Sequence, residues 1–460
     1  MTTIEPRTES PPPAPRVHPA RLRSEAHLER IPQLARLSEE QRFAMRVVSQ
    51  VLPFRVNDYV LSELIDWERV PADPLFQMTF PQPGMLVPEH FQRVARALRA
   101  GRSREELGAI VRAIRADLNP HPAAQRELNV PRRAGVRLAG IQHKYRETVL
   151  FFPSQGQTCH SYCTFCFRWA QFVGDASLRF ASGDAQDLRR YLAEHTEVSD
   201  LLVTGGDPMV MKTRVIARIL EPLLEPGLEH VQTVRIGTKA LTFWPHRFVS
   251  DGDADDLLRL LERVVRAGRH VAVMAHTNHA RELRTSVARE AVRRLRSTGA
   301  VIRSQGPLLR HVNDDPAAWS EMWREQVRLG IVPYYMFVER DTGARRYFEV
   351  PLARAHRIYH DAIGSVSGLA RTARGPSMST SPGKVEVQGV AEIAGEQVFV
   401  LRFLQARDPD WVARPFHARF DPRATWLDDL EPAFGQDAFF WEEDFEAFCR
   451  RRRFRNTQAG

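Results

Sequence analysis

Between residues 145 and 370, short apolar runs alternate with longer amphipathic stretches along the chain. The runs have the length of buried strands, and the stretches between them, such as DADDLLRLLERVVRAG, place apolar residues at helical spacing. The strand-like runs are VLFF (149–152), DLLVTG (200–205), VQTVRIG (231–237), HVAVMAH (270–276), AVIRSQG (300–306) and VPYYMFV (332–338). Six strand-then-helix units with right-handed crossovers predict an α/β fold, a partial (βα)6 TIM-like barrel with helices on its outer face.

The flanking regions carry different patterns. Residues 1–24 are rich in proline, serine and glutamate and are expected to be a disordered tail, whereas 25–142 hold amphipathic stretches such as LSEEQRFAMRVVSQVL and predict a helical N-terminal region. The barrel itself is assigned to 143–370. In the C-terminal region, 371–460, the stretch LARTARGPSMSTSPGK predicts a loop, and KVEVQGVAEIAGEQVFVLRFL predicts two strands joined at an Ala-Gly pair. The tail that follows is expected to pack over one end of the barrel.

Three of the four cysteines lie close together. Cys159, Cys163 and Cys166 occur in TCHSYCTFCFR, and only Cys449 stands elsewhere. Three thiolates can hold a [4Fe-4S] cluster and leave the fourth iron open to another ligand. The alternatives are a zinc knuckle completed by His160 or a distant histidine, unligated core cysteines, and a non-enzymatic metal-binding module. Because adjacent residues seldom ligate one ion, His160 is a poor fourth ligand, and the iron–sulfur interpretation is preferred.

Further motifs follow the cysteines in a fixed order. They are HKY (143–145), Cys-x3-Cys-x2-Cys with Arg168 after it, GGD (205–207), RIG (235–237), HTNH (276–279), LLRHVND (308–314), PYY (333–335) and PGK (382–384). Over His143 to Val387 the chain resembles the lysine 2,3-aminomutase family of radical S-adenosylmethionine enzymes. The resemblance implies an isomerase that moves an amino group from the α to the β carbon of an amino acid. It also implies that S-adenosylmethionine chelates the open iron and yields a 5′-deoxyadenosyl radical when the cluster is reduced.

The resemblance places the S-adenosylmethionine site at the strand ends. Ligand groups of such folds gather at the carboxyl ends of the parallel strands, where these motifs lie. Glycines without a Cβ also let a backbone approach the methionine part of a cofactor closely. The residues implied as cofactor contacts are Gly205, Gly206, Asp207, Arg235, His276 and Gln305.

Lysine is scarce in this chain. Only four of the 65 basic residues are lysines, at 144, 212, 239 and 384. A lysine that survives in such a composition is a candidate for chemistry that a guanidinium cannot perform, such as covalent binding of an aldehyde cofactor. In the family, a lysine after a Pro-Gly pair binds pyridoxal 5′-phosphate in this way, and Lys384 is the match. Compositional drift and a surface lysine are the competing explanations.

The substrate residues are implied by the same resemblance. Arg168 matches an arginine that holds the substrate carboxylate, for which a planar bidentate donor is suited. Tyr145 and Arg146 lie near the expected pyridoxal phosphate site. Where lysine-specific members hold the distal ammonium with two aspartates, this chain has Arg340 and a position near Ser377. A guanidinium repels an ammonium and attracts a carboxylate, so the expected substrate is an amino acid without a distal cation, of which an acidic one such as glutamate is an example; a one-residue shift to Asp341 would restore lysine.

The remaining expectations concern the reaction and the partners. Because SMSTSPGK replaces the family's longer glycine run, a radical S-adenosylmethionine enzyme without pyridoxal phosphate, performing dehydration, dehydrogenation or epimerisation, is the alternative function. An electron donor such as a flavodoxin or ferredoxin is expected. The chain lacks the family's C-terminal zinc-binding cysteines, so any homo-oligomer must rest on other contacts. The charge of +9 and the run RRRFR (451–455) predict a solvated tail rather than nucleic-acid binding. No apolar run is long enough for a membrane span, and a cytoplasmic location is expected.

Overall fold

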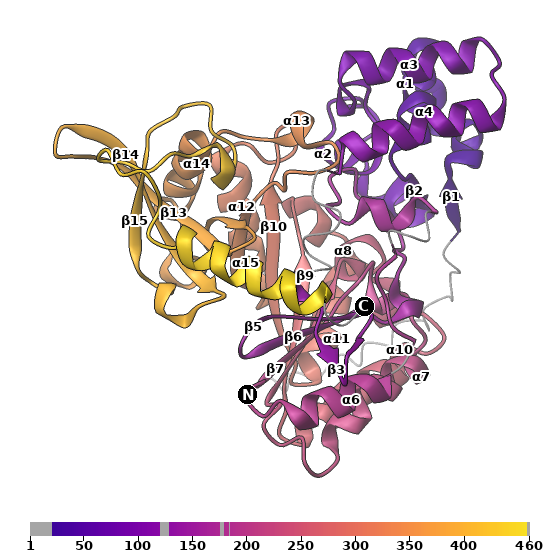
Figure 1. Cartoon of the computed structure of the whole chain (residues 1–460). Helices are drawn as coiled ribbons and strands as arrows, with labels where there is room; N and C mark the ends of the chain where they lie inside the picture. The colour runs from indigo at the N-terminus through magenta and orange to yellow at the C-terminus, as the bar shows by residue number, and fades with distance from the viewer. Residues whose placement is uncertain (1–20, 120–127, 175–178, 184, 458–460) are drawn as a thin grey trace, which may run out of the picture.

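The computed structural model describes residues 21–119, 128–174, 179–183 and 185–457 (Figure 1). Of the tail predicted for 1–24, only the last four residues fall within these ranges, and three of them form strand β1 (Leu22–Ser24). No helix in the described ranges is both long and apolar enough to cross a membrane.

One large sheet organises the described part of the chain. Its strand order is β15-β14-β13-β12-β11-β10-β9-β8-β7-β6-β5. Each strand from β6 to β11 pairs in parallel with the next, whereas the pairs β5–β6, β12–β13, β13–β14 and β14–β15 are antiparallel. The strands are β5 (Ile141–Tyr145), β6 (Thr148–Phe151), β7 (Asp200–Val203), β8 (Thr233–Thr238), β9 (His270–His276), β10 (Val301–Leu308), β11 (Val332–Val338), β12 (Arg374–Ser379), β13 (Gly383–Ile393), β14 (Glu396–Ala406) and β15 (Pro415–Arg419). The six predicted strands are therefore confirmed as β6 to β11, with a mixed α/β fold.

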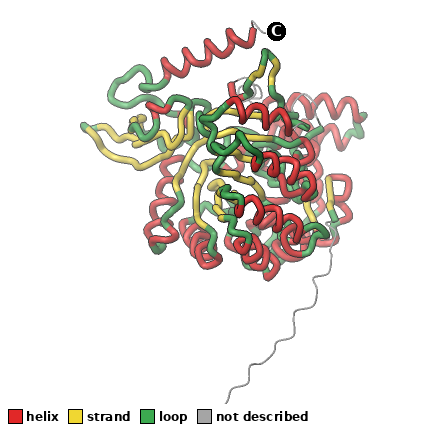
Figure 2. Tube along the Cα trace, turned by 90° about the horizontal axis from the view of Figure 1, so that it is seen from below, coloured by secondary structure: helices red, strands yellow, loops and turns green. Residues whose placement is uncertain are grey.

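Helices follow the parallel strands and cover the outer face of the sheet, as Figure 2 shows. They are α6 (Ala185–Glu194), α7 (Thr213–Leu220), α10 (Ala254–Arg266), α11 (Ser286–Ser297), α12 (Pro316–Leu329) and α14 (Leu352–Gly364), with the short helices α8 (Ala240–Phe243), α9 (His246–Val249) and α13 (Arg345–Phe348). Alternate residues of each strand face the helices or the barrel interior. In β8, Val234 and Ile236 join the apolar cluster that contains Leu257 of α10, so Arg235 and Gly237 face the interior.

The C-terminal region extends the sheet, and one part of it was predicted wrongly. The stretch LARTARGPSMSTSPGK, expected to be a loop, contains β12, a seventh parallel strand. Its sequence lacks the β-branched residues that usually indicate a strand. Small residues stand there instead, because the backbone of the neighbouring strand lies very close. A Cβ on Gly375 would lie 2.4 Å from the carbonyl oxygen of Met336 in β11. The hairpin β13–β14 turns at Ala394 and Gly395 as expected, both with positive φ.

The N-terminal region packs against the cysteine-containing loop. Its elements are β2 (Arg55–Asn57), α1 (Glu39–Val51), α2 (Pro74–Thr79), α3 (Pro88–Arg99) and α4 (Arg104–Asp117), followed by a small hairpin of β3 (Arg132–Arg133) and β4 (Val136–Arg137). Ser38 and Ser103 begin α1 and α4 with capping boxes, which satisfies their free backbone N–H groups. An apolar cluster joins this region to Phe165 and Trp169, the residues around Cys166. The N-terminal region therefore supports the loop that carries the cysteines.

The tail ends in helix α15 (Glu442–Thr457). The basic run predicted as solvated begins in this helix, where Arg451 is exposed but Arg452 is half-buried. Arg452 Nη2 donates to the carbonyl of Val130 at 3.2 Å. At least one residue of the run therefore holds the tail against the segment that precedes β3.

Candidate active site

The three cysteines lie in the loop that follows β6, and the N-terminal region holds this loop by its backbone. Arg55 of β2 accepts at its carbonyl from Tyr162 N at 2.8 Å, and its guanidinium donates to the carbonyl of Cys159 at 3.4 Å. Asn57 donates to the carbonyl of His160 at 3.1 Å. Cys166 N bonds to the carbonyl of Cys163 at 3.2 Å, which gives the loop a tight turn. The cysteine side chains are therefore presented from a fixed backbone.

The thiols stand in a setting that favours metal binding. Burial raises the pKa of Cys159 and of Cys163 well above their usual values, and it raises the pKa of Cys166 to about 11. Each thiolate also disfavours ionisation of its neighbours, so the three cannot be thiolates together without added positive charge. Iron supplies that charge, and coordination removes the thiol protons. The donor set of three grouped thiols thus fits a cubane cluster with one open iron.

The Gly205–Gly206 pair after β7 packs against the same loop. A Cβ on Gly206 would lie 2.5 Å from the backbone N and O of Thr158, and one on Gly205 would lie 2.3 Å from Nε2 of Gln157. Gly205 also has a φ of +151°. Close packing on the cysteine loop already requires both glycines, so their contact with a cofactor stays a prediction.

Asp207 is buried and joins two loops of the mouth. Its carboxylate accepts from the Thr238 hydroxyl at 2.7 Å, from Lys239 N at 2.9 Å and from Met209 N at 2.9 Å. Burial raises its pKa, and these bonds oppose the rise. These hydrogen bonds hold the loops after β7 and β8 together, and the role of Asp207 as a cofactor contact stays a prediction.

His276 and Gln305 lie side by side at the ends of β9 and β10, where the strands pair them in register. The His276 ring stacks on Phe165, which lies between Cys163 and Cys166, with 6.1 Å between ring centroids. Burial lowers the pKa of His276 to about 3, and its buried Nδ1 has no hydrogen-bond partner among the residues that the structure describes. A neutral imidazole with an unused nitrogen beside the cysteine loop is well placed to bind a ligand there.

Arg235 of β8 forms an ion pair with an aspartate of the neighbouring strand β7. Its Nε donates to Oδ1 of Asp200 in β7 at 2.8 Å, within a two-bond pair. Its charge contributes to lowering the pKa of Lys384. The structure therefore places Arg235 in the barrel interior near Lys384, paired with Asp200.

The HKY motif is divided by a bulge in β5. The register shifts between His143 and Tyr145, which turns Lys144 and Tyr145 away from the face that His143 occupies. Lys144 Nζ donates to the carbonyl of Thr380, and the charge of Lys384 acts on it. Arg146, in the turn after β5, is exposed. The structure brings Tyr145 to the interior but does not bring the Arg146 side chain there, because the hairpin turns back before it.

Lys384 lies in an aromatic setting inside the barrel. Its Nζ is 4.0 Å from the ring centre of Tyr335 and 5.4 Å from that of Phe337, both in β11. Burial lowers its pKa to about 7, and the charges of Arg235 and Arg374 act in the same direction. Near neutral pH, a large share of this amine is therefore unprotonated and nucleophilic.

Arg168 and Arg340 lie near each other between the cysteines and Lys384. Arg168 stacks on Phe152 at 4.4 Å, and burial together with Arg340 lowers its pKa to about 10, against the opposing effect of Cys166. Arg340 packs over Phe167 at 5.6 Å, and its buried Nε has no hydrogen-bond partner. Two guanidiniums of this kind, one with unused donor capacity, can bind carboxylates.

Asp341 faces a different space from Arg340. It lines a cavity of about 410 Å³ with His90 and Asp117 of the N-terminal region, and Arg340 is not among the lining residues. The two side chains nevertheless form an ion pair, with Arg340 Nε 3.6 Å from Asp341 Oδ1. Ser377 is buried and donates to the carbonyl of Met336 at 3.4 Å. The two positions predicted for a distal aspartate, Arg340 and Ser377, therefore place no carboxylate beside Lys384.

Positive charge dominates this part of the barrel. The sequence did not single out Arg374 or Arg407, yet Arg374 contributes to lowering the pKa of Lys384, and the charge of Arg407 acts on Lys144 and on Tyr145. Glu339 is also buried, and burial raises its pKa well above the usual value, against the opposing charge of Arg340. The scarcity of lysine was a signal for Lys144 as well as for Lys384. For the two arginines, no signal distinguished them among so many.

Comparison with known proteins agrees with this geometry. A putative L-lysine 2,3-aminomutase of Aquifex aeolicus is 30% identical over 394 residues, which cover 85% of this chain and 91% of that protein. An L-lysine 2,3-aminomutase of Methanococcus maripaludis is 22% identical over 72% of this chain and 65% of its own length. A glutamate 2,3-aminomutase of Clostridioides difficile is 28% identical over 46% of this chain and 47% of its own length. No protein-family model matches the chain.

An α/β barrel with three grouped cysteines at its mouth defines a radical S-adenosylmethionine enzyme. This chain belongs to the lysine 2,3-aminomutase family of those enzymes. The family relationship implies S-adenosylmethionine and a [4Fe-4S] cluster on Cys159, Cys163 and Cys166, and an amino acid as the substrate. The relatives are 2,3-aminomutases, which are isomerases.

Proposed function

We propose that this protein is a pyridoxal phosphate-dependent 2,3-aminomutase that acts on an amino acid with a carboxylate side chain, such as glutamate. When bound, the iron–sulfur cluster with S-adenosylmethionine supplies a hydrogen-abstracting radical, and pyridoxal phosphate activates the migrating amino group. The proposal rests on one observation above all. Lys384, one of only four lysines, lies inside the barrel with its pKa lowered to about 7.

The chain's own residues divide the work in this proposal. Cys159, Cys163 and Cys166 hold the cluster, while His276 binds S-adenosylmethionine through its unused nitrogen. Lys384 binds the aldehyde cofactor as a neutral amine, with Tyr335 packed against it at 4.0 Å. The stacked aromatic side chains around Lys384 exclude water from the reacting carbon, which protects a radical from side reactions.

The positive charge supports an acidic substrate. Arg340 is close enough to Arg168 for its charge to contribute to lowering the pKa of Arg168, and a dicarboxylate can bridge the two guanidiniums. A distal ammonium would instead meet the guanidinium of Arg340. At about 4 Å and an effective dielectric constant of about 20, that repulsion costs about 4 kcal/mol. L-lysine is therefore disfavoured as the substrate.

The test is anaerobic incubation of the reconstituted enzyme with each common amino acid, a reductant and S-adenosylmethionine. We expect conversion of a dicarboxylic amino acid to its β-amino isomer, identified by unchanged mass and a shifted retention time. Lys384→Ala should lose both the product and the absorbance band of bound pyridoxal phosphate at about 420 nm. Lys212→Ala, which removes an exposed lysine, should keep both.

Two results would overturn parts of this proposal. Normal turnover of L-lysine that persists in Arg340→Gln would contradict the acidic substrate. A product of different mass, formed by an enzyme that never binds pyridoxal phosphate, would establish instead a radical dehydration or dehydrogenation on the same barrel.

A further inference from the structure

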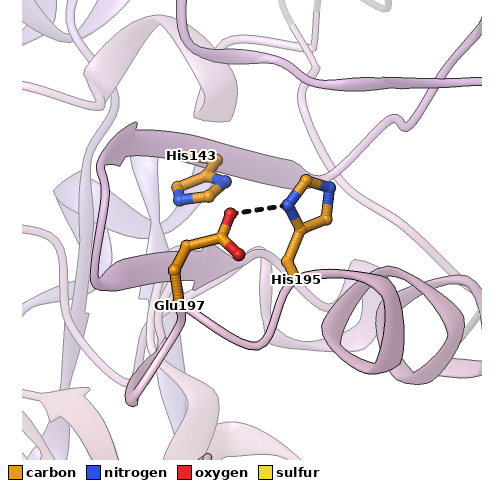
Figure 3. A group of neighbouring side chains, drawn as sticks. All are labelled: His143, His195 and Glu197. Atoms are coloured by element: carbon orange, nitrogen blue, oxygen red, sulfur yellow. Dashed lines mark hydrogen bonds and ion pairs between the residues drawn. The ribbon is translucent and has the colours of Figure 1, made fainter.

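A group of titratable side chains lies on the outer side of β5, apart from the proposed active site. His143 comes from β5, His195 from the end of α6, and Glu197 from the segment that leads to β7 (Figure 3). One potential ligand atom from each residue lies within 4.8 Å of the other two. Nothing in the proposed function uses these residues, because the bulge in β5 turns His143 away from the barrel interior.

The hydrogen bonds of His143 are those of a metal-binding histidine. Its Nε2 faces the carbonyl of Arg146 at 2.9 Å, and since a carbonyl only accepts, this nitrogen carries the hydrogen. Its Nδ1 therefore carries a lone pair and no hydrogen. This lone pair accepts the hydrogen bond of the Tyr191 hydroxyl, 2.7 Å away. A metal-binding histidine commonly donates its other N–H to a backbone carbonyl in this way. Burial also lowers the pKa of His143, so its ring is neutral and able to coordinate.

His195 and Glu197 complete the group. The Nδ1 of His195 lies 2.8 Å from Oε1 of Glu197, and the His195 ring packs on Tyr191 with 4.1 Å between ring centroids. An ion bound at about 2.1 Å in tetrahedral geometry needs its ligand atoms about 3.4 Å apart. The three ligand atoms here lie within 4.8 Å of one another, so shifts of about 1 Å would bring them around one ion. The side chains of His195 and Glu197 are 34% and 32% exposed, which gives an ion access from solvent.

We propose that His143, His195 and Glu197 bind one divalent transition-metal ion of the zinc class, with solvent as the fourth ligand. Two imidazoles and one carboxylate are a ligand set that zinc accepts. When the ion binds, it replaces two hydrogen bonds: the one that the Tyr191 hydroxyl donates to His143, and the one between His195 and Glu197. It joins β5 to α6 and to the start of β7. This site goes beyond the proposed function and does not depend on it.

The test measures zinc on the full-length, anaerobically reconstituted protein. After incubation with Zn²⁺ and desalting, we expect one zinc per chain in addition to the cluster iron, with nitrogen and oxygen neighbours only in the zinc-edge X-ray absorption spectrum. His195→Ala and Glu197→Gln each remove one exposed ligand and should weaken zinc binding at least tenfold. The matched control is His360→Ala, because His360 also pairs with a carboxylate, Asp361, at 3.0 Å on the surface.

Several outcomes would overturn the site. Zinc retained equally by the wild type and by His195→Ala would place the ion elsewhere, and sulfur neighbours in the spectrum would assign it to the cysteines. Failure of the wild type to retain any zinc would show that the group is only a hydrogen-bonded cluster. Binding should also weaken as the pH falls from about 7 to about 5, because protons compete for the imidazoles. Binding that does not change over this range would equally contradict the assignment.

Discussion

Lys384 is expected to capture pyridoxal phosphate at neutral pH without a separate base. Its pKa of about 7 results from burial and from the charges of Arg235 and Arg374. A lysine with a pKa of about 10.5 is neutral in only about one molecule in 3,000 at pH 7, whereas Lys384 is neutral in about half. The difference in pKa of about 3.5 corresponds to about 5 kcal/mol in favour of the reactive form.

The assay follows the rate of covalent cofactor binding by absorbance in the protein without pyridoxal phosphate, between about pH 6 and pH 10. The rate should fall below pH 7, where the amine gains a proton, and level off above about pH 8. Arg374→Gln removes one of the nearby positive charges, so the midpoint should move to higher pH. Arg402→Gln is the control, because Arg402 pairs with Glu386 at 2.8 Å and is not among the groups that act on Lys384. A wild-type rate that climbs tenfold per pH unit up to about pH 10 would refute the reasoning.

Three further predictions follow from individual contacts. Gly206→Ala should reduce the iron content of the reconstituted protein, because its Cβ would lie 2.5 Å from the cysteine loop backbone, whereas Gly252→Ala meets no atom within 4 Å and should leave the iron unchanged. Arg340→Gln should raise KM for a dicarboxylic substrate about 10- to 100-fold, which corresponds to the loss of about 1.5–3 kcal/mol from a charged hydrogen bond. The control is Arg346→Gln, which changes an exposed arginine and should leave KM unchanged. Equal effects of the two substitutions would contradict the role of Arg340. Ala394→Gly should raise the free energy of unfolding by up to about 1 kcal/mol, measured by urea titration, because Ala394 has a φ of +52° in the hairpin turn; a loss of stability would contradict this.

Much of the barrel could be predicted from periodicity. Strands β6 to β11 are apolar runs bounded by amphipathic helices, so the sequence alone predicts that they are buried. Strand β12 could not be found in this way, because its buried positions are small residues fitted against neighbouring backbone, as Gly375 is against Met336. Tertiary contact rather than strand propensity determines its conformation. Likewise, nothing local indicates that Arg452 in the basic tail bonds to the carbonyl of Val130, over 300 residues away.

The candidate site, like the fold, combines features that the local sequence predicts with features that only tertiary contacts determine. The spacing of the cysteines and the scarcity of lysine are visible in the sequence and led to the loop after β6 and to Lys384. The inward turn of Tyr145 depends on a bulge, and the pairing of Arg235 with Asp200 depends on the register of β7 and β8. Pairings of this kind are set by three-dimensional neighbours, so no motif could reveal them. The exposed position of Arg146 is explained by the same hairpin geometry.

The most direct test of the account is iron and 5′-deoxyadenosine analysis of the protein purified without oxygen. After reconstitution, about four irons per chain should be found, and reduction in the presence of S-adenosylmethionine should release 5′-deoxyadenosine. Cys163→Ala should abolish that release, while Cys449→Ala should preserve it. Zinc in place of iron and sulfide, or an iron-loaded protein that never cleaves S-adenosylmethionine, would contradict the claim that the three cysteines leave one reactive iron open.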